Sequence, residues 1–178
     1  MGMMNFGSQI NGSWRNEIGI EGSRRVKELL LKYLLDHRLI SEAQLKDGSV
    51  LSLKRSLLAD DVLGFTVTNN YKVIFGSEPD ISIISPKGIL DAAIEVKAGI
   101  DPAGALERYG AAKKSFDRAL RENKSATTIY LASCITEGVK KAISDDRLVR
   151  REFNLTDIFV SEEAKEEFLE YIKWLMHL

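Results

Sequence analysis

The sequence predicts an α/β protein with a mixed central β-sheet and helices on both of its faces. Two β-branched runs flank a turn at Pro86–Gly88, the pattern of a β-hairpin. A long amphipathic segment, 102–123, then leads to an apolar run at 127–132. A helical crossover of this length lets the strands before and after it lie parallel in one sheet. Hairpin and crossover together predict a sheet with both antiparallel and parallel pairs.

Size and composition favour one domain spanning residues 1–178. Of the 178 residues, 44% are hydrophobic and 29% are charged, typical of a chain with a buried core and a solvated surface. The single cysteine, Cys134, excludes an internal disulfide, and two histidines without cysteine partners argue against zinc. We see no membrane span and no signal peptide, and we expect a cytoplasmic protein.

The first half of the chain should contain helices followed by two strands. Residues 1–20 hold four glycines and are predicted to form an extended N-terminal arm. Next we predict a helix over 21–37 capped by Ser23, a short helical turn or linker over 41–47, and a second helix over 50–63. Two strands, over 65–68 and 71–75, should follow, joined by a turn at Asn69–Asn70.

The second half begins after the hairpin. Asp101 and Pro102 are a good N-cap and first residue for the helix over 102–123. Beyond the strand at 127–132, we predict a helix over 136–143, a turn over 145–147 and a final helix over 161–178 capped by Ser161.

Charge is distributed unevenly along the chain although the formal net charge is only −1. Residues 97–151 carry twelve Lys or Arg against seven Asp or Glu, and residues 152–178 carry seven acids against two bases. Such asymmetry is compatible with a basic face for a polyanion, and equally with chance segregation on a solvated surface.

Three charged residues lie where the predicted hairpin is open. Asp80 lies at the start of the first strand. Glu95 and Lys97 lie at the end of the second strand, with their side chains on the same face. Two carboxylates suit Mg²⁺, and an adjacent lysine can hold a phosphate or a nucleophilic water, which is the apparatus of phosphodiester hydrolysis. The alternative is a solvated charge pair at a strand end. Glu28 is either a third acid of this site or an exposed helical glutamate.

Pro79-Asp80 followed by Glu95-Val96-Lys97 on consecutive strands resembles the PD-(D/E)xK nuclease superfamily. Residues 99–116 are similar to the segment after the catalytic lysine in type II restriction endonucleases, including those that cut CCCGGG. The resemblance implies a restriction-endonuclease-like core.

The resemblance also implies roles for individual residues. Asp80, Glu95 and the Val96 carbonyl would bind one or two Mg²⁺ ions, and Lys97 would orient or activate the attacking water. The substrate would be double-stranded DNA, cut by a homodimer because two strands need two sites. Candidate phosphate contacts, each also explicable as a solvated charge, are Lys87, Arg108, Lys113, Lys114 and Arg118.

Two other functions remain open from the sequence. The first is a DNA repair or Holliday-junction-type nuclease, which uses the same chemistry on branched DNA. The second is a catalytically inert DNA-binding subunit with a nuclease-like core. Retention of two neighbouring carboxylates against their mutual repulsion argues against the inert alternative.

Overall fold

A computed structural model describes residues 6–52 and 57–178, with the backbone alone for residues 6–19 and 52. The helices are α1 (Phe6–Asp36), α2 (Ala105–Glu122), α3 (Glu137–Asp146), α4 (Leu155–Val160) and α5 (Glu162–Leu175). The strands are β1 (Ile40–Leu45), β2 (Val50–Ser52), β3 (Val62–Val67), β4 (Lys72–Phe75), β5 (Ile81–Ile84), β6 (Leu90–Lys97), β7 (Thr127–Ala132) and β8 (Arg151–Asn154). Two short 3-10 helices, Ala59–Asp61 and Pro102–Gly104, precede β3 and α2.

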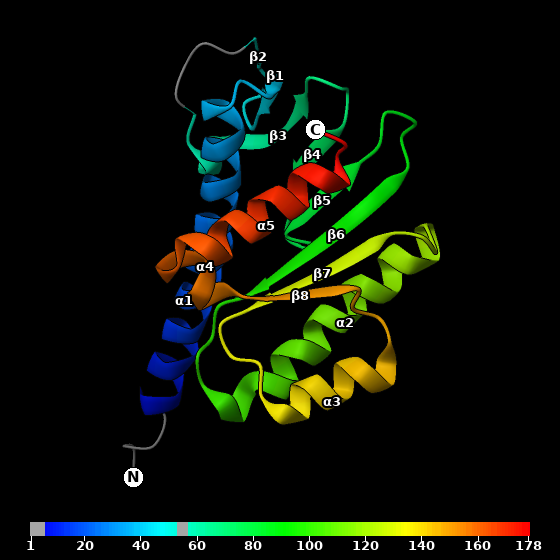
Figure 1. Cartoon of the computed structure of the whole chain (residues 1–178). Helices are drawn as coiled ribbons and strands as arrows, with labels where there is room; N and C mark the ends of the chain where they lie inside the picture. The colour runs from blue at the N-terminus through cyan, green and yellow to red at the C-terminus, as the bar shows by residue number, and fades with distance from the viewer. Residues whose placement is uncertain (1–5, 53–56) are drawn as a thin grey trace.

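In the described part of the chain the strands form one eight-stranded sheet in the order β2-β1-β3-β4-β5-β6-β7-β8 (Figure 1). The pairs from β2 to β6 are antiparallel, whereas β6–β7 and β7–β8 are parallel. Strand β6 is therefore the boundary between the antiparallel and the parallel parts of the sheet. The predicted mixed α/β fold is confirmed.

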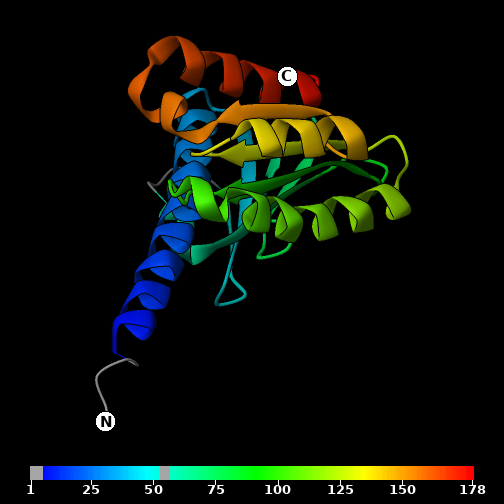
Figure 2. The same cartoon turned by 90° about the horizontal axis from the view of Figure 1, so that it is seen from below.

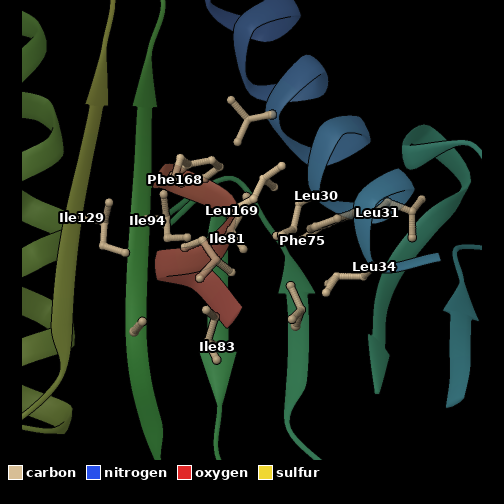
Figure 3. Packing of buried hydrophobic residues seen from close by; sticks show 14 of the residues in the cluster. Leu30, Leu31, Leu34, Phe75, Ile81, Ile83, Ile94, Ile129, Phe168 and Leu169 are labelled. Carbon is tan, nitrogen blue, oxygen red and sulfur yellow. The ribbon is translucent and has the colours of Figure 1, made fainter. Parts of the chain in front are cut away.

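Helices cover both faces of this sheet. Helices α1, α4 and α5 pack on one face, and α2 and α3 on the other (Figures 1 and 2). The main core includes fully buried residues of α1, the central strands and α5, among them Leu30, Ile83, Ile94 and Phe168 (Figure 3). None of the helices in the described residues has the length and apolar character of a membrane-spanning segment.

Several elements follow the sequence prediction closely. The hairpin forms from β5 and β6, and its turn includes Gly88 at a φ of 76°, a left-handed conformation that suits glycine. The Asp101 carboxylate accepts hydrogen bonds from the amides of Ala103 and Gly104, and α2 follows. Strand β7 pairs parallel to β6, as the helical crossover predicts.

Predictions for the first sixty residues were less accurate. Helix α1 begins at Phe6, so residues 6–20 are helical rather than an extended arm, and residues 1–5 lie outside the described part. Ser23 lies inside α1 and does not cap it.

Residues 41–63 were also predicted wrongly. The segment predicted as a short helical turn or linker over 41–47 lies mostly in strand β1. In place of a helix over 50–63, the described residues form β2, a 3-10 turn and the start of β3. Strand β8 and helix α4 were not predicted.

Candidate active site

The β5–β6 hairpin brings the predicted site residues together at its open end. Ile81 pairs with Ile94, so the next residues outward along the two strands are Asp80 and Glu95. Lys97 is the last residue of β6, two positions beyond Glu95 and on the same face. All three side chains thus reach the end of the sheet where its antiparallel and parallel parts meet.

Asp80 is held by two hydrogen bonds from different elements. Its Oδ2 accepts from the Val96 amide of β6 at 2.9 Å, and its Oδ1 accepts from the Ser23 hydroxyl of α1 at 2.5 Å. Strand β5 begins one residue later, at Ile81, and its pairing with β6 ends at Ile94. The Asp80 carboxylate therefore accepts a hydrogen bond from a β6 amide that β5 no longer reaches. Asp80 is 8% exposed, and its orientation is fixed from both sides.

Glu95 is the most deeply buried charged residue at the site, at 1% exposure. Its Oε2 accepts a hydrogen bond from Lys97 Nζ at 2.6 Å. Its Oε1 is buried, and no donor among the described residues, the nearby Ser115 hydroxyl included, meets it with the distance and angle of a hydrogen bond. A buried acceptor without a partner is unfavourable and uncommon in folded proteins, which marks this oxygen as a candidate ligand atom.

Burial also changes the ionisation of Glu95. Desolvation raises the pKa of its carboxyl above the usual value, and the negative charge of Asp80 adds to this effect. The Lys97 ammonium and the Ser115 hydroxyl of α2 act in the opposite direction, because they favour the ionised form. The site therefore favours a cation near the two carboxylates.

A pocket of about 920 Å³ opens in front of these residues, between the end of β6, α1 and α2. Asp80, Val96 and Lys97 line it, whereas Glu95 lies behind them. Its walls also carry charged residues that come from different parts of the chain, namely Arg24, Lys27, Lys46, Asp60, Asp101, Glu107 and Arg108. The carboxylates thus lie at the inner end of a polar pocket with basic groups around it.

Helix α1 reaches the pocket because it crosses the end of β6 at two small residues. A Cβ atom added to Gly22 would lie 2.2 Å from the Ala98 Cβ, so only glycine fits at this crossing. The close approach places the next residue, Ser23, within bonding distance of Asp80. Gly22 and Ala98 therefore set the distance between α1 and the site.

The predicted DNA contacts lie in four different places. Arg108 lines the pocket, donates to the Asp101 carbonyl and packs against Gly99 and Gly104. Lys114 and Arg118 are exposed on α2, where Arg118 lies 3.6 Å from Glu78. Of the five predicted contacts, only Arg108 lines the pocket.

Lys87 lies in the closed turn of the hairpin, opposite the end that carries Asp80. Lys113 pairs with Asp146 of α3 at 2.9 Å. Glu28 is not among the residues that line the pocket, and its carboxylate binds Arg24 at 2.6 Å.

Sequence reasoning missed two residues of α1 that belong to this region, Ser23 and Lys27. Ser23 is 57 positions from its partner Asp80, and Lys27 Nζ donates to the Gly76 carbonyl, 49 positions away. Serine and lysine in a helix carry no local signal for such contacts. Only the small Gly22 hinted that α1 packs closely against another element.

A mixed sheet flanked by helices, with paired carboxylates at the end of its central hairpin, defines an α/β protein with a restriction-endonuclease-like core. The family model described as XcyI restriction endonuclease matches residues 1–145. The chain belongs to this family of type II restriction endonucleases. No protein curated for its function matches the chain.

Proposed function

We propose that this chain is a Mg²⁺-dependent endodeoxyribonuclease that hydrolyses phosphodiester bonds in double-stranded DNA. In this proposal the catalytic residues are Asp80, Glu95 and Lys97. The observation that carries it is the buried Glu95 carboxylate, which has one oxygen on Lys97 and the other without a partner, beside Asp80. Membership of the restriction endonuclease family supports DNA as the substrate. It also favours restriction over repair.

The residues at the site fit a magnesium ion. Within the described residues there is no cluster of three or more His, Cys, Asp or Glu arranged for a metal, so the carboxylate ligands would be two. Carboxylate and carbonyl oxygens are the hard ligands that Mg²⁺ prefers, and it usually keeps several waters and binds substrate phosphate. The Val96 amide points at Asp80, and the Val96 carbonyl faces the same side because both groups of a strand residue do so.

Each side chain has a separate task in this proposal. Asp80, Glu95 and the Val96 carbonyl would hold the ion, and Ser23 would keep Asp80 turned toward it. Bound Mg²⁺ would supply a Lewis acid that stabilises the charge developing on the phosphate and the leaving oxygen. Lys97 would donate hydrogen bonds to a phosphate oxygen and to the attacking water, while Glu95 keeps its ammonium oriented.

Cleavage of both strands requires two such sites. We propose that two copies of the chain assemble around a two-fold axis that coincides with the symmetry of a palindromic DNA site. Phosphate contacts from Arg108, Lys114 and Arg118 would position the duplex without reading its sequence.

The test is incubation of the protein with phage DNA and Mg²⁺, followed by electrophoresis. Discrete fragments are the expected result, since a restriction enzyme cuts at a limited set of sequences. Asp80→Asn and Lys97→Met should each lower the cleavage rate by roughly 10²-fold or more, because each removes a group that acts on the transition-state charge. Asp91→Asn removes a carboxylate from the same strand away from the site and is the matched control.

Two results would contradict the proposal. Intact DNA with the unmodified protein over a range of Mg²⁺ and Mn²⁺ concentrations would favour an inert subunit. Cleavage by Asp80→Asn at the unmodified rate would show that the reaction does not use this site.

A further inference from the structure

Lys27 lies in the pocket on the side of Asp80 that belongs to α1. Its Nζ donates to the Gly76 carbonyl at 2.8 Å and lies 5.9 Å from the centre of the Phe75 ring. The Gly76 amide in turn donates to the Asp80 carbonyl at 2.9 Å, which connects Lys27 to the backbone of the site. Lys97 reaches the same pocket from β6, on the face covered by α2.

In the described part of the chain, the charge of Lys27 lacks the ion pairs that Arg24 and Lys97 make. It shares this property in the pocket with Lys46 and Arg108. Arg24 pairs with Glu21 and Glu28, and Lys97 pairs with Glu95. Within the described residues, Lys27 makes no ion pair and only one hydrogen bond to an uncharged carbonyl. A half-buried ammonium without an anionic partner is unfavourable, so the position is poorly explained by stability alone.

The surroundings of Lys27 contain groups of both signs. Burial lowers the pKa of its ammonium, and the positive charge of Lys46 acts in the same direction. Asp80, Asp60 and Glu95 oppose this effect. If the two carboxylates of the site are occupied by a divalent cation, as the proposed function requires, Lys27 and Lys46 are left facing the pocket with less negative charge around them.

We propose that Lys27 binds a backbone phosphate of the DNA on the α1 side of the pocket, next to the phosphate that Lys97 contacts. This inference rests on the proposed function, since its ligand is the DNA phosphodiester chain. Lys27 and Lys97 approach from opposite faces of the sheet, so together they would hold consecutive phosphates of one strand across the carboxylates. Phosphate contacts of this kind fix the position of the duplex and carry no sequence information.

A purely structural function for Lys27 is the competing explanation. By holding the Gly76 carbonyl, the ammonium could simply fix the loop from Gly76 to Asp80. The two explanations differ in what the positive charge does. A structural hydrogen bond needs a donor, whereas a phosphate contact needs a cation and makes DNA binding depend on salt.

The experiment measures DNA affinity against salt concentration for three variants. Lys27→Gln keeps an amide donor for the Gly76 carbonyl but removes the charge, and Lys27→Met removes both. Lys32→Met is the control, because Lys32 is an exposed residue of the same helix that pairs with Asp36. Binding is followed by fluorescence anisotropy of a labelled duplex containing CCCGGG, and of a scrambled duplex, with Ca²⁺ in place of Mg²⁺ so that a divalent cation can occupy the carboxylates. Electrophoresis of each sample checks that the duplex stays intact.

One lost phosphate contact reduces the slope of log K against log salt by about 0.9 for duplex DNA. Both Lys27 variants should show this reduction on both duplexes, whereas Lys32→Met should keep the unmodified slope. Thermal unfolding of each variant checks that it is folded. If Lys27→Met does not fold, the comparison is made between Lys27→Gln and Lys32→Met alone.

An unmodified slope in Lys27→Gln would overturn the inference and leave Lys27 as a structural residue. The same reduction in Lys32→Met would also overturn it, because the effect would then reflect the general charge of α1. Failure of the unmodified protein to bind either duplex is a different result, because it contradicts the proposed function itself.

Discussion

At the scale of single residues, the site depends on a carboxylate that is poorly accommodated in the protein alone. Glu95 is buried, carries a raised pKa and has one oxygen without a partner. Asp80 differs, because Ser23 and the Val96 amide satisfy both of its oxygens. The two carboxylates should therefore respond differently to mutation.

We predict that Glu95→Gln makes the metal-free protein more stable at neutral pH while it abolishes cleavage. Because the pKa of Glu95 is raised in the folded protein, the folded state binds its proton more tightly than the unfolded state does. The free energy of unfolding is therefore highest at low pH, where the carboxyl is protonated, and it falls as the pH rises through the raised pKa. Glutamine resembles the protonated acid at every pH. Removal of the buried negative charge at the oxygen without a partner should raise the free energy of unfolding by about 1–3 kcal/mol.

Thermal unfolding in EDTA measures this effect. The melting temperature should rise by about 2–4 °C per kcal/mol for a chain of this size. The difference between the two proteins should disappear as the pH falls toward 4.5, the ordinary pKa of a glutamate side chain. A lower melting temperature for Glu95→Gln at pH 7.5 would show that the ion pair with Lys97 dominates.

Ser23 should affect the metal rather than the fold. Ser23→Ala removes the hydrogen bond that orients Asp80, and losing such a supporting contact typically weakens metal binding by about 10–100-fold. Calorimetric titration with Mn²⁺ measures this directly, without DNA. Ser41→Ala is the control, because that hydroxyl bonds the Thr66 carbonyl on the exposed surface of β1. Equal Mn²⁺ affinity in both variants would rule out a positioning function for Ser23.

At the scale of elements, the crossing of α1 over the end of β6 determines how the pocket is built. Gly22 and Ala98 allow the close approach, and Ser23 and Lys27 then reach the site from α1. The crossing therefore couples the packing of a helix to the geometry of the carboxylates.

We predict that Gly22→Ala destabilises the protein by about 1–3 kcal/mol, as is usual for an overpacked contact. Ala98→Gly should rescue it, because the nearest atoms to the new Cβ would then be the Cα of residue 98 at 3.5 Å and Leu155 Cδ2 at 3.6 Å. The double-mutant cycle, followed by denaturant unfolding and Mn²⁺ affinity, measures this coupling.

Gly110→Ala on α2 is the matched control for this cycle. Its new Cβ meets nothing within 4 Å, so it should stabilise by about 0.5–1 kcal/mol through helix propensity. Additive effects of Gly22→Ala and Ala98→Gly would refute the proposed contact.

The same scale explains where sequence reasoning succeeded and failed. The hairpin around Pro86–Gly88 and the helix after Asp101 could be predicted because their signals are local. Strand β1 pairs with β3 through two register shifts, and its buried residues Ile40 and Ala43 are three positions apart. That spacing imitates a helix, so the period-two signal of a strand was absent.

Asp80, Glu95 and Lys97 could be proposed from the sequence because the strand pairing that brings them together lies within one hairpin. Ser23 and Lys27 could not, since their partners depend on how α1 docks. Three glycines within residues 6–20 suggested an extended arm, but helix α1 includes this stretch. Glycine lowers helix propensity by only about 1 kcal/mol per residue, which the rest of a long helix can offset.

At the scale of the whole molecule, the matched family region and the folded core do not coincide. The family model ends at residue 145, before β8, α4 and α5. Yet Ile158, Phe168, Ile172 and Met176 are essentially fully buried in the main core. The C-terminal helices therefore complete the face of the sheet that α1 also covers.

We predict that a protein ending at Asn154 does not fold, although it keeps every strand of the described sheet and all proposed site residues. Deleting one large buried side chain costs about 2–5 kcal/mol, and the loss of four exceeds the total stability of a typical domain. Circular dichroism and limited trypsin digestion would show an unfolded, rapidly degraded chain. Trp174→Ala, at a 64% exposed position of α5, should change stability by less than about 1 kcal/mol. A cooperative melting transition in the shortened protein would contradict the prediction.

The order of the strands has a consequence for how such an enzyme could change over time. Asp80, Glu95 and Lys97 lie within residues 80–97, on neighbouring strands joined by one tight turn. The backbone that carries them is thus inherited as one compact segment, whereas Ser23 and Lys27 come from the long first helix. Substitutions at Lys27 of α1 could change DNA binding while the hairpin segment with the proposed metal ligands stays unchanged, so substrate preference and chemistry could diverge at separate rates.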